Sequence, residues 1–466
     1  MEKIDLRAAV EPKLFAAVLE VSRLVAAAGG RAYIVGGAVR DMLLGAKSVK
    51  DVDLEVYHLA PEKLQETLRG KFDFDSCGVS FGVLKLKRFD IDVSLPRRES
   101  KRGLGHRGFL VASDPELSIP EAASRRDFTV NAMYFDPLAE ELIDPYHGRE
   151  DLAAKVLRHV SPKFAEDPLR VLRGMQFVAR FGLEPAPETI EICRAMTPEG
   201  LAPERLMEEW SKLLVKGVRI SRGLEFLRAT GWVKYYPELA ALIGCKQAPE
   251  WHPEGDVWNH TLCCLDAFAC ERDEKYPGED EENLLVALAV LCHDFGKPAC
   301  TRFDSKKDRI VSRGHDEAGV APTRAFLARL TNEERLLKEV PPLVQLHMRP
   351  FAMWKSHSTD SAIRRLAAKV GRIDRLLRVA AADDRGRPPF PPQPEHLEWL
   401  AREAERLAVA AAAPKPIFLG RHLIALGRSP GPDFKPILDA VFEAQLDGKF
   451  SDLEGATEYY RRHFAK

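Results

Sequence analysis

Two glycines and two aspartates near the N-terminus are the residues best suited to chemistry. Gly36 and Gly37 follow the apolar run 33–35, and Asp51 and Asp53 come a short loop later. Glycine lets backbone amides approach a phosphate closely, and the residues after Gly37 read as a helix start, whose unpaired N–H groups favour anions. Residues two apart on a strand project from one face, so the carboxylates of Asp51 and Asp53 would lie close together. They would repel each other unless cations lay between them. The pattern predicts a phosphate-and-metal site, although a glycine turn followed by two solvated acids also fits it.

Two later motifs carry charges that suit a nucleotide. Arg126 and Asp127 place a cation that fits triphosphate oxygens beside an acid that can accept from ribose hydroxyls. Asp167 and Arg170 lie three apart at a predicted helix start, which makes them neighbours on one helical face. The carboxylate of Asp167 is an acceptor and the guanidinium of Arg170 is a donor, so together they could hydrogen-bond to the edge of a nucleotide base. Ordinary surface charges and a structural ion pair are the alternatives.

In this order, the motifs resemble the bacterial class II tRNA nucleotidyltransferase/poly(A) polymerase family. The residues that carry the resemblance are Gly36, Gly37, Arg40, Asp41, Asp51, Asp53, Arg125, Arg126, Asp127, Glu166, Asp167 and Arg170. The resemblance implies an α+β, polymerase-β-like nucleotidyltransferase head in which Asp51 and Asp53 are catalytic and bind two Mg²⁺ ions. Asp92 is a possible third carboxylate.

The resemblance also implies how the nucleotide is held. The implied contacts are Gly36, Gly37 and Arg40 at phosphates, Arg126 and Asp127 at the triphosphate and ribose, and Asp167 and Arg170 as a protein template for the base, with Arg173 also counted as nucleotide-binding. The terminal hydroxyl of an RNA would attack the α-phosphate of a nucleoside triphosphate, and pyrophosphate would leave.

The product is not fixed by these motifs. Addition of CCA to tRNA from CTP and ATP is the favoured interpretation. Addition of CC or A alone and poly(A) synthesis share the same residues and stay open. The basic segment 97–107, which reads as a mobile loop, is one place where the difference could lie.

A second set of residues predicts another metal site. Its members are His260, His293, Asp294, His315, His347 and Asp383. Imidazole and carboxylate together suit a transition metal such as Ni²⁺, Mn²⁺ or Co²⁺ better than Mg²⁺. The order His, His-Asp, Asp resembles the HD phosphohydrolase superfamily, which implies a metal-activated attack on a phosphoester, such as a 2′,3′-cyclic phosphate or a 2′-phosphate. A hydrolase with a vestigial transferase head and a non-catalytic RNA-binding protein are the alternatives from other functional classes.

Length and patterning indicate how these sites are positioned. A chain of 466 residues is longer than one hydrophobic core usually serves, so several domains are expected. Apolar residues at helical spacing predict helices at 168–181, 188–196, 204–215 and 221–230. The expected fold is an α+β head followed by all-α neck, body, HD domain and tail. The expected domains are a head at 1–147, a neck and body at 148–245, an HD domain at 246–386, and a linker with helical tail at 387–466.

Bulk composition narrows the class of protein. The formal net charge is −1, so an RNA partner must be bound by local patches. The chain has no apolar run long enough for a membrane and no signal-like N-terminus, and its eight cysteines lack metal-type CxxC spacing. We therefore expect a cytoplasmic protein without membrane partners, with mostly buried, reduced thiols. Its oligomeric state, monomer or homodimer, is left open.

Overall fold

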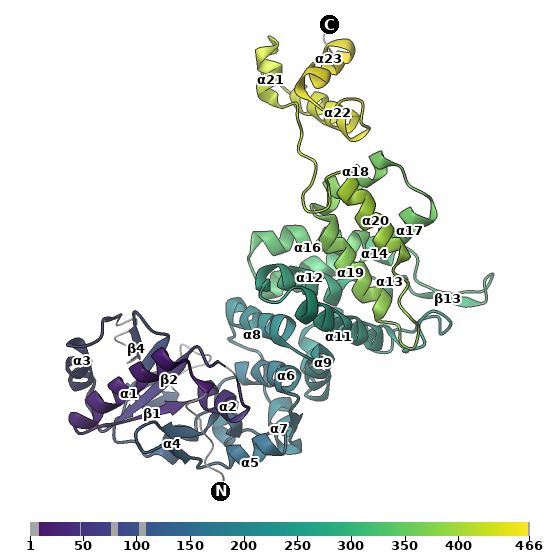
Figure 1. Cartoon of the computed structure of the whole chain (residues 1–466). Coiled ribbons are helices and arrows are strands. Elements are labelled where there is room, and N and C mark those ends of the chain that lie inside the picture. The colour runs from purple at the N-terminus through teal and green to yellow at the C-terminus, as the bar shows by residue number, and fades with distance from the viewer. Residues whose placement is uncertain (1–8, 47, 76–82, 102–108, 465–466) are drawn as a thin grey trace. The chain divides into compact units, whose positions relative to one another are not determined.

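The computed structural model describes residues 9–46, 48–75, 83–101 and 109–464. The chain divides into two compact units (Figure 1). The first comprises residues 1–213 and 222–235, and the second comprises 214–221 and 236–466. Each carries one of the predicted sites.

A mixed seven-stranded sheet forms the centre of the first unit, in the order β3-β4-β5-β2-β1-β8-β9. The strands are β1 (Arg31–Val35), β2 (Val52–Tyr57), β3 (Phe74–Asp75), β4 (Val83–Leu86), β5 (Ile91–Ser94), β8 (Tyr134–Asp136) and β9 (Glu141–Ile143). In β2 the apolar side chains of Val52, Leu54 and Val56 are buried, while Asp53 and Glu55 alternate with them. This period of two therefore sends the polar residues to the opposite face.

Short helices flank the sheet. They are α1 (Pro12–Ala27), α2 (Gly37–Leu43), α3 (Pro61–Arg69), α4 (Ile119–Ala123) and α5 (Gly148–Ala153). A separate hairpin joins β6 (Arg97–Lys101) to β7 (Phe109–Ser113). The segment predicted as a mobile basic loop is thus strand at its start, while residues 102–108 lie outside the described part of the chain.

The helices that follow the sheet lie within two residues of their predicted limits. They are α6 (Leu169–Phe181), α7 (Pro187–Arg194), α8 (Pro203–Lys216) and α9 (Ile220–Ala229). They pack closely: a Cβ on Gly223 would lie 2.5 Å from the Leu213 side chain and 2.7 Å from the Met175 carbonyl oxygen. A short parallel pair joins β10 (Val156–Leu157), which precedes α6, to β11 (Glu184–Pro185), which follows it.

The second unit is helical apart from one hairpin, β12 (Arg302–Asp304) and β13 (Arg309–Val311). Its helices are α10 (Pro237–Ala240), α11 (Val257–Lys275), α12 (Asp280–Cys292), α13 (Lys297–Cys300), α14 (His315–Ala318), α15 (Val320–Leu330), α16 (Glu334–Leu346), α17 (Arg349–Lys355), α18 (Asp360–Val370), α19 (Ile373–Arg385), α20 (Glu395–Arg406), α21 (Gly420–Ala425), α22 (Phe434–Leu446) and α23 (Leu453–Phe464). Every residue of α12 from Leu285 to Cys292 is buried, so this helix is the centre of the core.

The proline-rich segment 387–394 is followed by α20, which packs on α17 and α19. A smaller core, with Phe418, Leu423, Val441 and Tyr460 among its members, holds α21–α23 together. No helix in the described part of the chain is both long and apolar enough to cross a membrane.

Candidate functional site

Three carboxylates gather at one end of β2 and β5. Asp53 pairs with Val35 of β1 on one side and, in parallel register, with Asp92 of β5 on the other. Asp51 lies one residue before β2. Loss of hydration is the largest cause of a raised pKa for Asp53; Arg126 lowers this pKa, whereas Asp92 and Asp51 raise it. The sheet thus places a third acid beside the predicted pair.

Gly36 lies beside this cluster. Its φ is +70°, a left-handed conformation that residues other than glycine adopt only with strain. A Cβ there would lie 3.4 Å from Nη1 of Arg126 and 3.8 Å from Oδ2 of Asp53. The glycine therefore brings the backbone close to a cation and a carboxylate, and Gly37 begins α2.

Arg126 is held in place by the sheet. Its Nη2 lies 3.1 Å from Oε2 of Glu55, and its guanidinium lies over the ring of Tyr134, 5.2 Å from the centroid. The hydroxyl of Tyr134 donates to Oε1 of Glu55 at 3.1 Å. Glu55, which the sequence analysis did not single out, thus fixes the cation that lies beside Gly36.

A chain of hydrogen bonds joins α2 to α6 through Asp127. Arg40 donates to Oδ1 of Asn131 at 2.7 Å, and the Asn131 amide donates to Oδ1 of Asp127 at 3.0 Å. Nε of Arg173 donates to Oδ2 of Asp127 at 2.7 Å. Burial alone would raise the pKa of Asp127, but Arg173 and the Asn131 amide lower it below its ordinary value. Asp127 is therefore an ionised link within the fold.

Arg40 lies inside the protein in this structure. It is 5% exposed, and its guanidinium stacks on Phe181 with a centroid distance of 4.2 Å. Its donors are directed to Asn131 and to the neighbouring Asp41. The predicted phosphate contact of Arg40 therefore stays a prediction, and its visible work is to anchor α2.

Asp167 and Arg170 are neighbours at the start of α6, but their side chains bond to different partners. Asp167 accepts from the Leu169 backbone N–H at 3.1 Å and from Nη2 of Arg205 at 2.8 Å. Arg170 donates to the backbone carbonyls of Lys163, at 2.8 Å, and of Arg125. The side chains of the two predicted template residues are thus each held by hydrogen bonds to other residues, and not by each other.

Two residues of α8 were missed by the sequence analysis. Arg205 holds Asp167, and Glu209, which is 1% exposed, lies 3.9 Å from Nη1 of Arg173. Residues four apart share a helical face, so the spacing of Arg205 and Glu209 could have indicated a polar face on α8.

Replacing Asn131 with alanine is expected to lower the free energy of unfolding by about 1–3 kcal/mol, because it removes one of the acceptors of the buried Arg40 and one of the donors to the buried Asp127. Urea denaturation measures the change. Asn332→Ala, at an exposed loop position, is the matched control and should be nearly neutral. An Asn131 variant as stable as the control would contradict the proposed network.

The second unit brings the six predicted metal ligands into one buried cluster. His260 comes from α11, His293 and Asp294 follow α12, and Asp383 lies on α19. Nε2 of His260 is 3.4 Å from Nε2 of His293, 3.0 Å from Oδ1 of Asp383 and 3.7 Å from Oδ2 of Asp294. Donors around one ion with bonds of about 2.1 Å are separated by about 3.4 Å in a tetrahedral site. The four donors are thus spaced as ligands of a single ion.

Asp294 also faces a second group of donors. Its Oδ1 lies 3.4 Å from Nε2 of His315, which is 3.4 Å from Nε2 of His347. One carboxylate therefore lies between two histidine-containing groups, the geometry that two bridged ions require.

Backbone carbonyls orient the histidine rings. Nδ1 of His293 lies 2.7 Å from the Val290 carbonyl oxygen, and Nδ1 of His347 lies 2.7 Å from that of Val344. Donation from Nδ1 leaves the lone pair on Nε2 directed into the cluster, which is how proteins prepare histidine to ligate metals.

The charge balance of the cluster favours a cation. Burial alone would lower the pKa of His293, but the carboxylate of Asp294 outweighs it and raises this pKa to about 10. Burial and the nearby His293 lower the pKa of His347 to about 4. Both oxygens of Asp294 are buried without a hydrogen bond of good geometry, although Nζ of Lys297 lies 2.7 Å away. Buried carboxylate oxygens and imidazole nitrogens together fit a transition metal.

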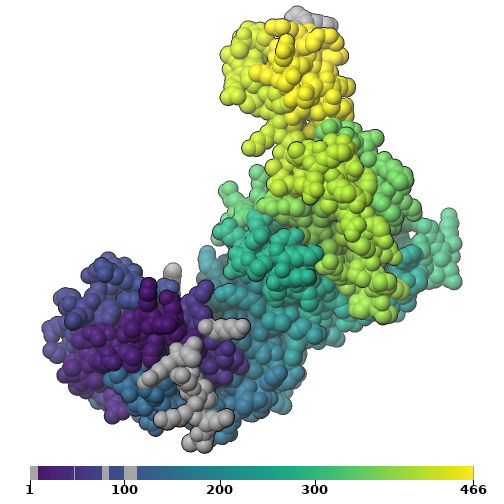
Figure 2. Space-filling view, in the orientation of Figure 1, coloured from purple at the N-terminus to yellow at the C-terminus, as the bar shows by residue number. Residues whose placement is uncertain are grey.

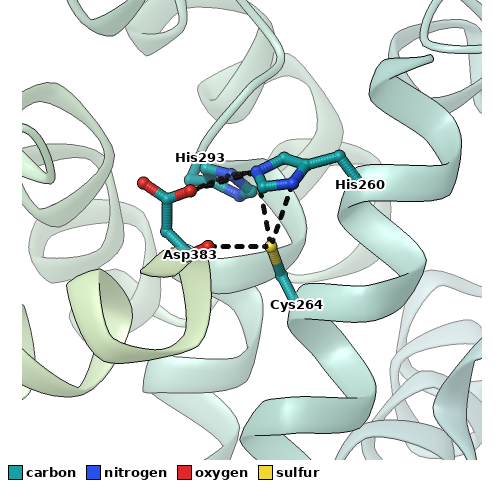
Figure 3. Close-up of side chains that lie close together, drawn as sticks. All are labelled: His260, Cys264, His293 and Asp383. Carbon is teal, nitrogen blue, oxygen red and sulfur yellow. Dashed lines mark hydrogen bonds and ion pairs between the residues drawn. The ribbon is translucent and has the colours of Figure 1, made fainter. Parts of the chain in front are cut away.

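Cys264 is the main surprise in this cluster (Figure 3). Its sulfur lies 3.5 Å from Nε2 of His260, one helical turn earlier on α11. A Cβ on Gly386 would lie 2.2 Å from this sulfur, so glycine is needed where α19 ends. The sequence analysis treated Cys264 as an ordinary buried thiol; its spacing of four from His260 was the available signal. The seven cysteines that the structure describes are all free thiols.

Comparison with known proteins places these sites in a family. Residues 32–158 match the model of the poly A polymerase head domain. The multifunctional CCA protein of Xylella fastidiosa (strain 9a5c) is 35% identical over 369 residues, which cover 77% of this chain and 84% of that protein.

Solved structures share the fold. The Bacillus stearothermophilus CCA-adding enzyme in complex with CTP aligns with a TM-score of 0.65 and 24% identity over 97% of this chain and 98% of that one. The Thermotoga maritima CCA-adding enzyme complexed with tRNA_CCA aligns with a TM-score of 0.57 and 19% identity, covering 97% and 96% of the two chains. The predicted family and the predicted α+β, polymerase-β-like head with following helices are thereby confirmed. The chain belongs to the multifunctional CCA protein family of class II CCA-adding tRNA nucleotidyltransferases.

Proposed function

We propose that this chain adds C, C and A to the 3′ end of tRNA, with CTP and ATP as the nucleotide donors. The observation that carries the proposal is that Asp53, Asp92 and Arg126 lie together at one end of β2, with Gly36 beside Asp53 and Arg126. A cation for a triphosphate and acids for a metal ion thus meet at one site. The relatives' names, and the CTP and tRNA_CCA that accompany two structures of this fold, support the same substrates.

The carboxylates at this site fit divalent metal ions. Their donors are carboxylate oxygens, which Mg²⁺ prefers, and crowding of Asp53 by Asp92 and Asp51 calls for a positive charge. We propose that Asp51 and Asp53 hold two Mg²⁺ ions, with Asp92 as a further ligand. Such ions would lower the pKa of the attacking hydroxyl and neutralise the leaving pyrophosphate.

The chain's own residues orient the reactants. In this proposal Arg126, fixed by Glu55, contacts the triphosphate. Asp167 and Arg170 present acceptor and donor groups to the base, with Arg205 holding Asp167 in place. A new bond forms between the terminal RNA oxygen and the α-phosphorus, the bond from that phosphorus to the bridging oxygen breaks, and pyrophosphate departs.

The experiment supplies α-³²P-labelled CTP or ATP and follows incorporation of the label into tRNA that lacks CCA and into an unrelated RNA, using chelator-treated protein and a Mg²⁺ titration. Incorporation that depends on Mg²⁺ is expected. Poly(A) tails on unrelated RNA would favour a poly(A) polymerase. Absence of incorporation into any RNA would favour a hydrolase whose transferase head is vestigial.

We propose in addition that the cluster of the second unit is a phosphohydrolase site. Its ligands would be His260, His293, Asp294, His315, His347 and Asp383, loaded with Ni²⁺, Mn²⁺ or Co²⁺, which would activate water and polarise the ester. A cavity of about 410 Å³, lined by Asp294, His315, His347 and Asp383, leads to these residues. The substrates would be 2′,3′-cyclic phosphates and 2′-phosphates of nucleotides. Elemental analysis together with hydrolysis of 2′,3′-cyclic AMP tests this site, and metal-free, inactive protein after Ni²⁺ and Mn²⁺ loading would refute it.

A further inference from the structure

Cys264 shares the buried cluster of the second unit with three of the predicted ligands (Figure 3). The donor atoms of His260, Cys264, His293 and Asp383 all lie within 4.8 Å of one another. Cys264 is fully buried, so it contributes nothing to the surface seen in Figure 2. A buried cysteine ordinarily packs as a small hydrophobe, whereas this sulfur has two imidazoles and a carboxylate beside it. Its surroundings are therefore those of a metal ligand.

The distance from the sulfur to the neighbouring imidazole fits two ligands of one ion. Sγ of Cys264 lies 3.5 Å from Nε2 of His260. Bonds of about 2.3 Å from an ion to sulfur and about 2.1 Å to nitrogen, at a tetrahedral angle, place the two donors about 3.6 Å apart. Nε2 of His260 is also 3.4 Å from Nε2 of His293 and 3.0 Å from Oδ1 of Asp383. The sulfur is thus spaced like the other donors.

The two imidazoles bring their Nε2 atoms close together. Nδ1 of His260 lies 2.7 Å from Oε1 of Glu254, and Nδ1 of His293 lies 2.7 Å from the Val290 carbonyl oxygen. Ligating histidines are neutral, and each of these acceptors takes the Nδ1 proton, so both Nε2 atoms then present a lone pair. Two lone pairs 3.4 Å apart call for a cation between them. The sulfur of Cys264 lies beside that place.

The end of α19 leaves room for this sulfur. A Cβ on Gly386 would lie 2.2 Å from Sγ of Cys264 and 3.0 Å from the Cys264 backbone nitrogen. The Gly386 carbonyl oxygen lies 3.2 Å from Nδ1 of His260. α11 and α19 therefore approach closely here, and the glycine lets them hold the thiol against the imidazole.

The sulfur would reach the ion from within the protein. Asp383 lines the cavity of the second unit, whereas Cys264 does not. A substrate that enters through the cavity does not displace a ligand from this side. The effect of the sulfur is therefore on which ion the cluster holds.

We infer that Cys264 is a ligand of the ion held by His260, His293 and Asp383, and that its sulfur makes this position select Zn²⁺ or Co²⁺ over Mn²⁺. The inference rests on the metal cluster of the proposed phosphohydrolase. Thiolate is a soft ligand that favours Zn²⁺, whereas Mn²⁺ prefers carboxylate and water oxygens. The thiol gives its proton to solvent as the bond between sulfur and metal forms. Among the described residues, the other group of donors, around Asp294, contains no sulfur, so the two positions differ in preference.

The test loads the chelator-treated full chain with two equivalents of Co²⁺ or Zn²⁺, enough for both groups of donors. We expect a charge-transfer band between sulfur and Co²⁺ in the near ultraviolet, and a sulfur neighbour at about 2.3 Å in the X-ray absorption spectrum of the Zn²⁺ form. Cys264→Ser should lose both signals. Cys263→Ser, which changes the adjacent, partly buried thiol outside the cluster, is the matched control and should keep both. Bound ions without either signal in the unmodified protein would overturn the inference.

Metal affinity separates a ligand from a residue that only packs. Cys264→Ser is expected to weaken Zn²⁺ binding at least about tenfold, but Mn²⁺ binding by less than about twofold. Competition with a chromophoric chelator measures both affinities in the His315→Gln background, so that the second group of donors does not take up the displaced ion. A packing defect would weaken both ions alike, so an equal loss would contradict the inference, as would unchanged Zn²⁺ affinity.

Spectra and hydrolysis distinguish failure of this inference from failure of the proposed function. A sulfur signal without hydrolysis of 2′,3′-cyclic AMP by the loaded protein would keep Cys264 as a ligand and remove the phosphohydrolase. Hydrolysis by a loaded protein that shows no sulfur signal would do the reverse. A chelator-treated chain that takes up no ion would overturn both.

Discussion

The Asp53→Ala variant is expected to incorporate CMP and AMP into tRNA at least about a thousandfold more slowly than the unmodified protein. Asp53 lies in the sheet between Val35 and Asp92, and its carboxylate lies beside Gly36. Metal ions that stabilise developing charge contribute several kcal/mol, and each 1.36 kcal/mol is tenfold in rate. Single-turnover incorporation of labelled nucleotide measures the loss.

Loss of folding would not explain such a result. The pKa of Asp53 is raised in the folded protein, so without divalent ions the ionised carboxylate weakens folding as the pH rises through its unfolded-state pKa. Asp53→Asn should therefore melt no lower than the unmodified protein at neutral pH, although it too should be inactive. Asp73→Ala, at an exposed position of the same unit, is the matched control for activity. An active, folded Asp53→Ala protein would show that these carboxylates are not the catalytic centre.

The Asp294→Asn variant is expected to lose bound transition metal and at least about a thousandfold in phosphoester hydrolysis, while its incorporation of nucleotides stays unchanged. Asp294 lies between the two donor groups, at 3.7 Å from His260 and 3.4 Å from His315. Asp294→Asn removes the negative charge that lies between the two groups and replaces one of the two carboxylate oxygens, each of which faces a different group, with an amide nitrogen. Elemental analysis and hydrolysis of 2′,3′-cyclic AMP measure the loss.

Asp294 is buried and Lys297 lies 2.7 Å from it, so the Asp294→Asn variant could lose activity by misfolding. A second variant controls for this outcome. His315→Gln removes a less buried ligand and should also abolish hydrolysis, whereas His357→Ala, at an exposed site, should not. The Asp53→Ala protein should hydrolyse 2′,3′-cyclic AMP normally. Loss of both activities in any single folded variant would contradict two independent centres.

Local patterns allowed much of this structure to be predicted. The period of two places Asp53 on the polar face of β2, and helical spacing located α6–α9 within two residues. The six histidines and aspartates of the second cluster were found because their residue types are rare together in ordinary core positions. Such signals depend on neighbours in the sequence or on residue chemistry alone.

What the sequence could not supply depends on distant pairing. Arg40 is held by Asn131, ninety-one positions away, and Asp92 reaches Asp53 only through the parallel pairing of β2 with β5. The partners of Arg170 are backbone carbonyls, which no side-chain motif encodes. A cytoplasmic location and the oligomeric state stay predictions.

The most direct test of the account uses three tRNAs that end at the discriminator base, at C and at CC. Each is incubated with the full chain, Mg²⁺ and either CTP or ATP alone, and the added nucleotides are read on a sequencing gel. The account predicts two C residues on the first tRNA, one on the second, and a single A on the third with ATP only. Incorporation of A alone, of C alone or of a long A tract would contradict CCA addition by the Asp51/Asp53 centre.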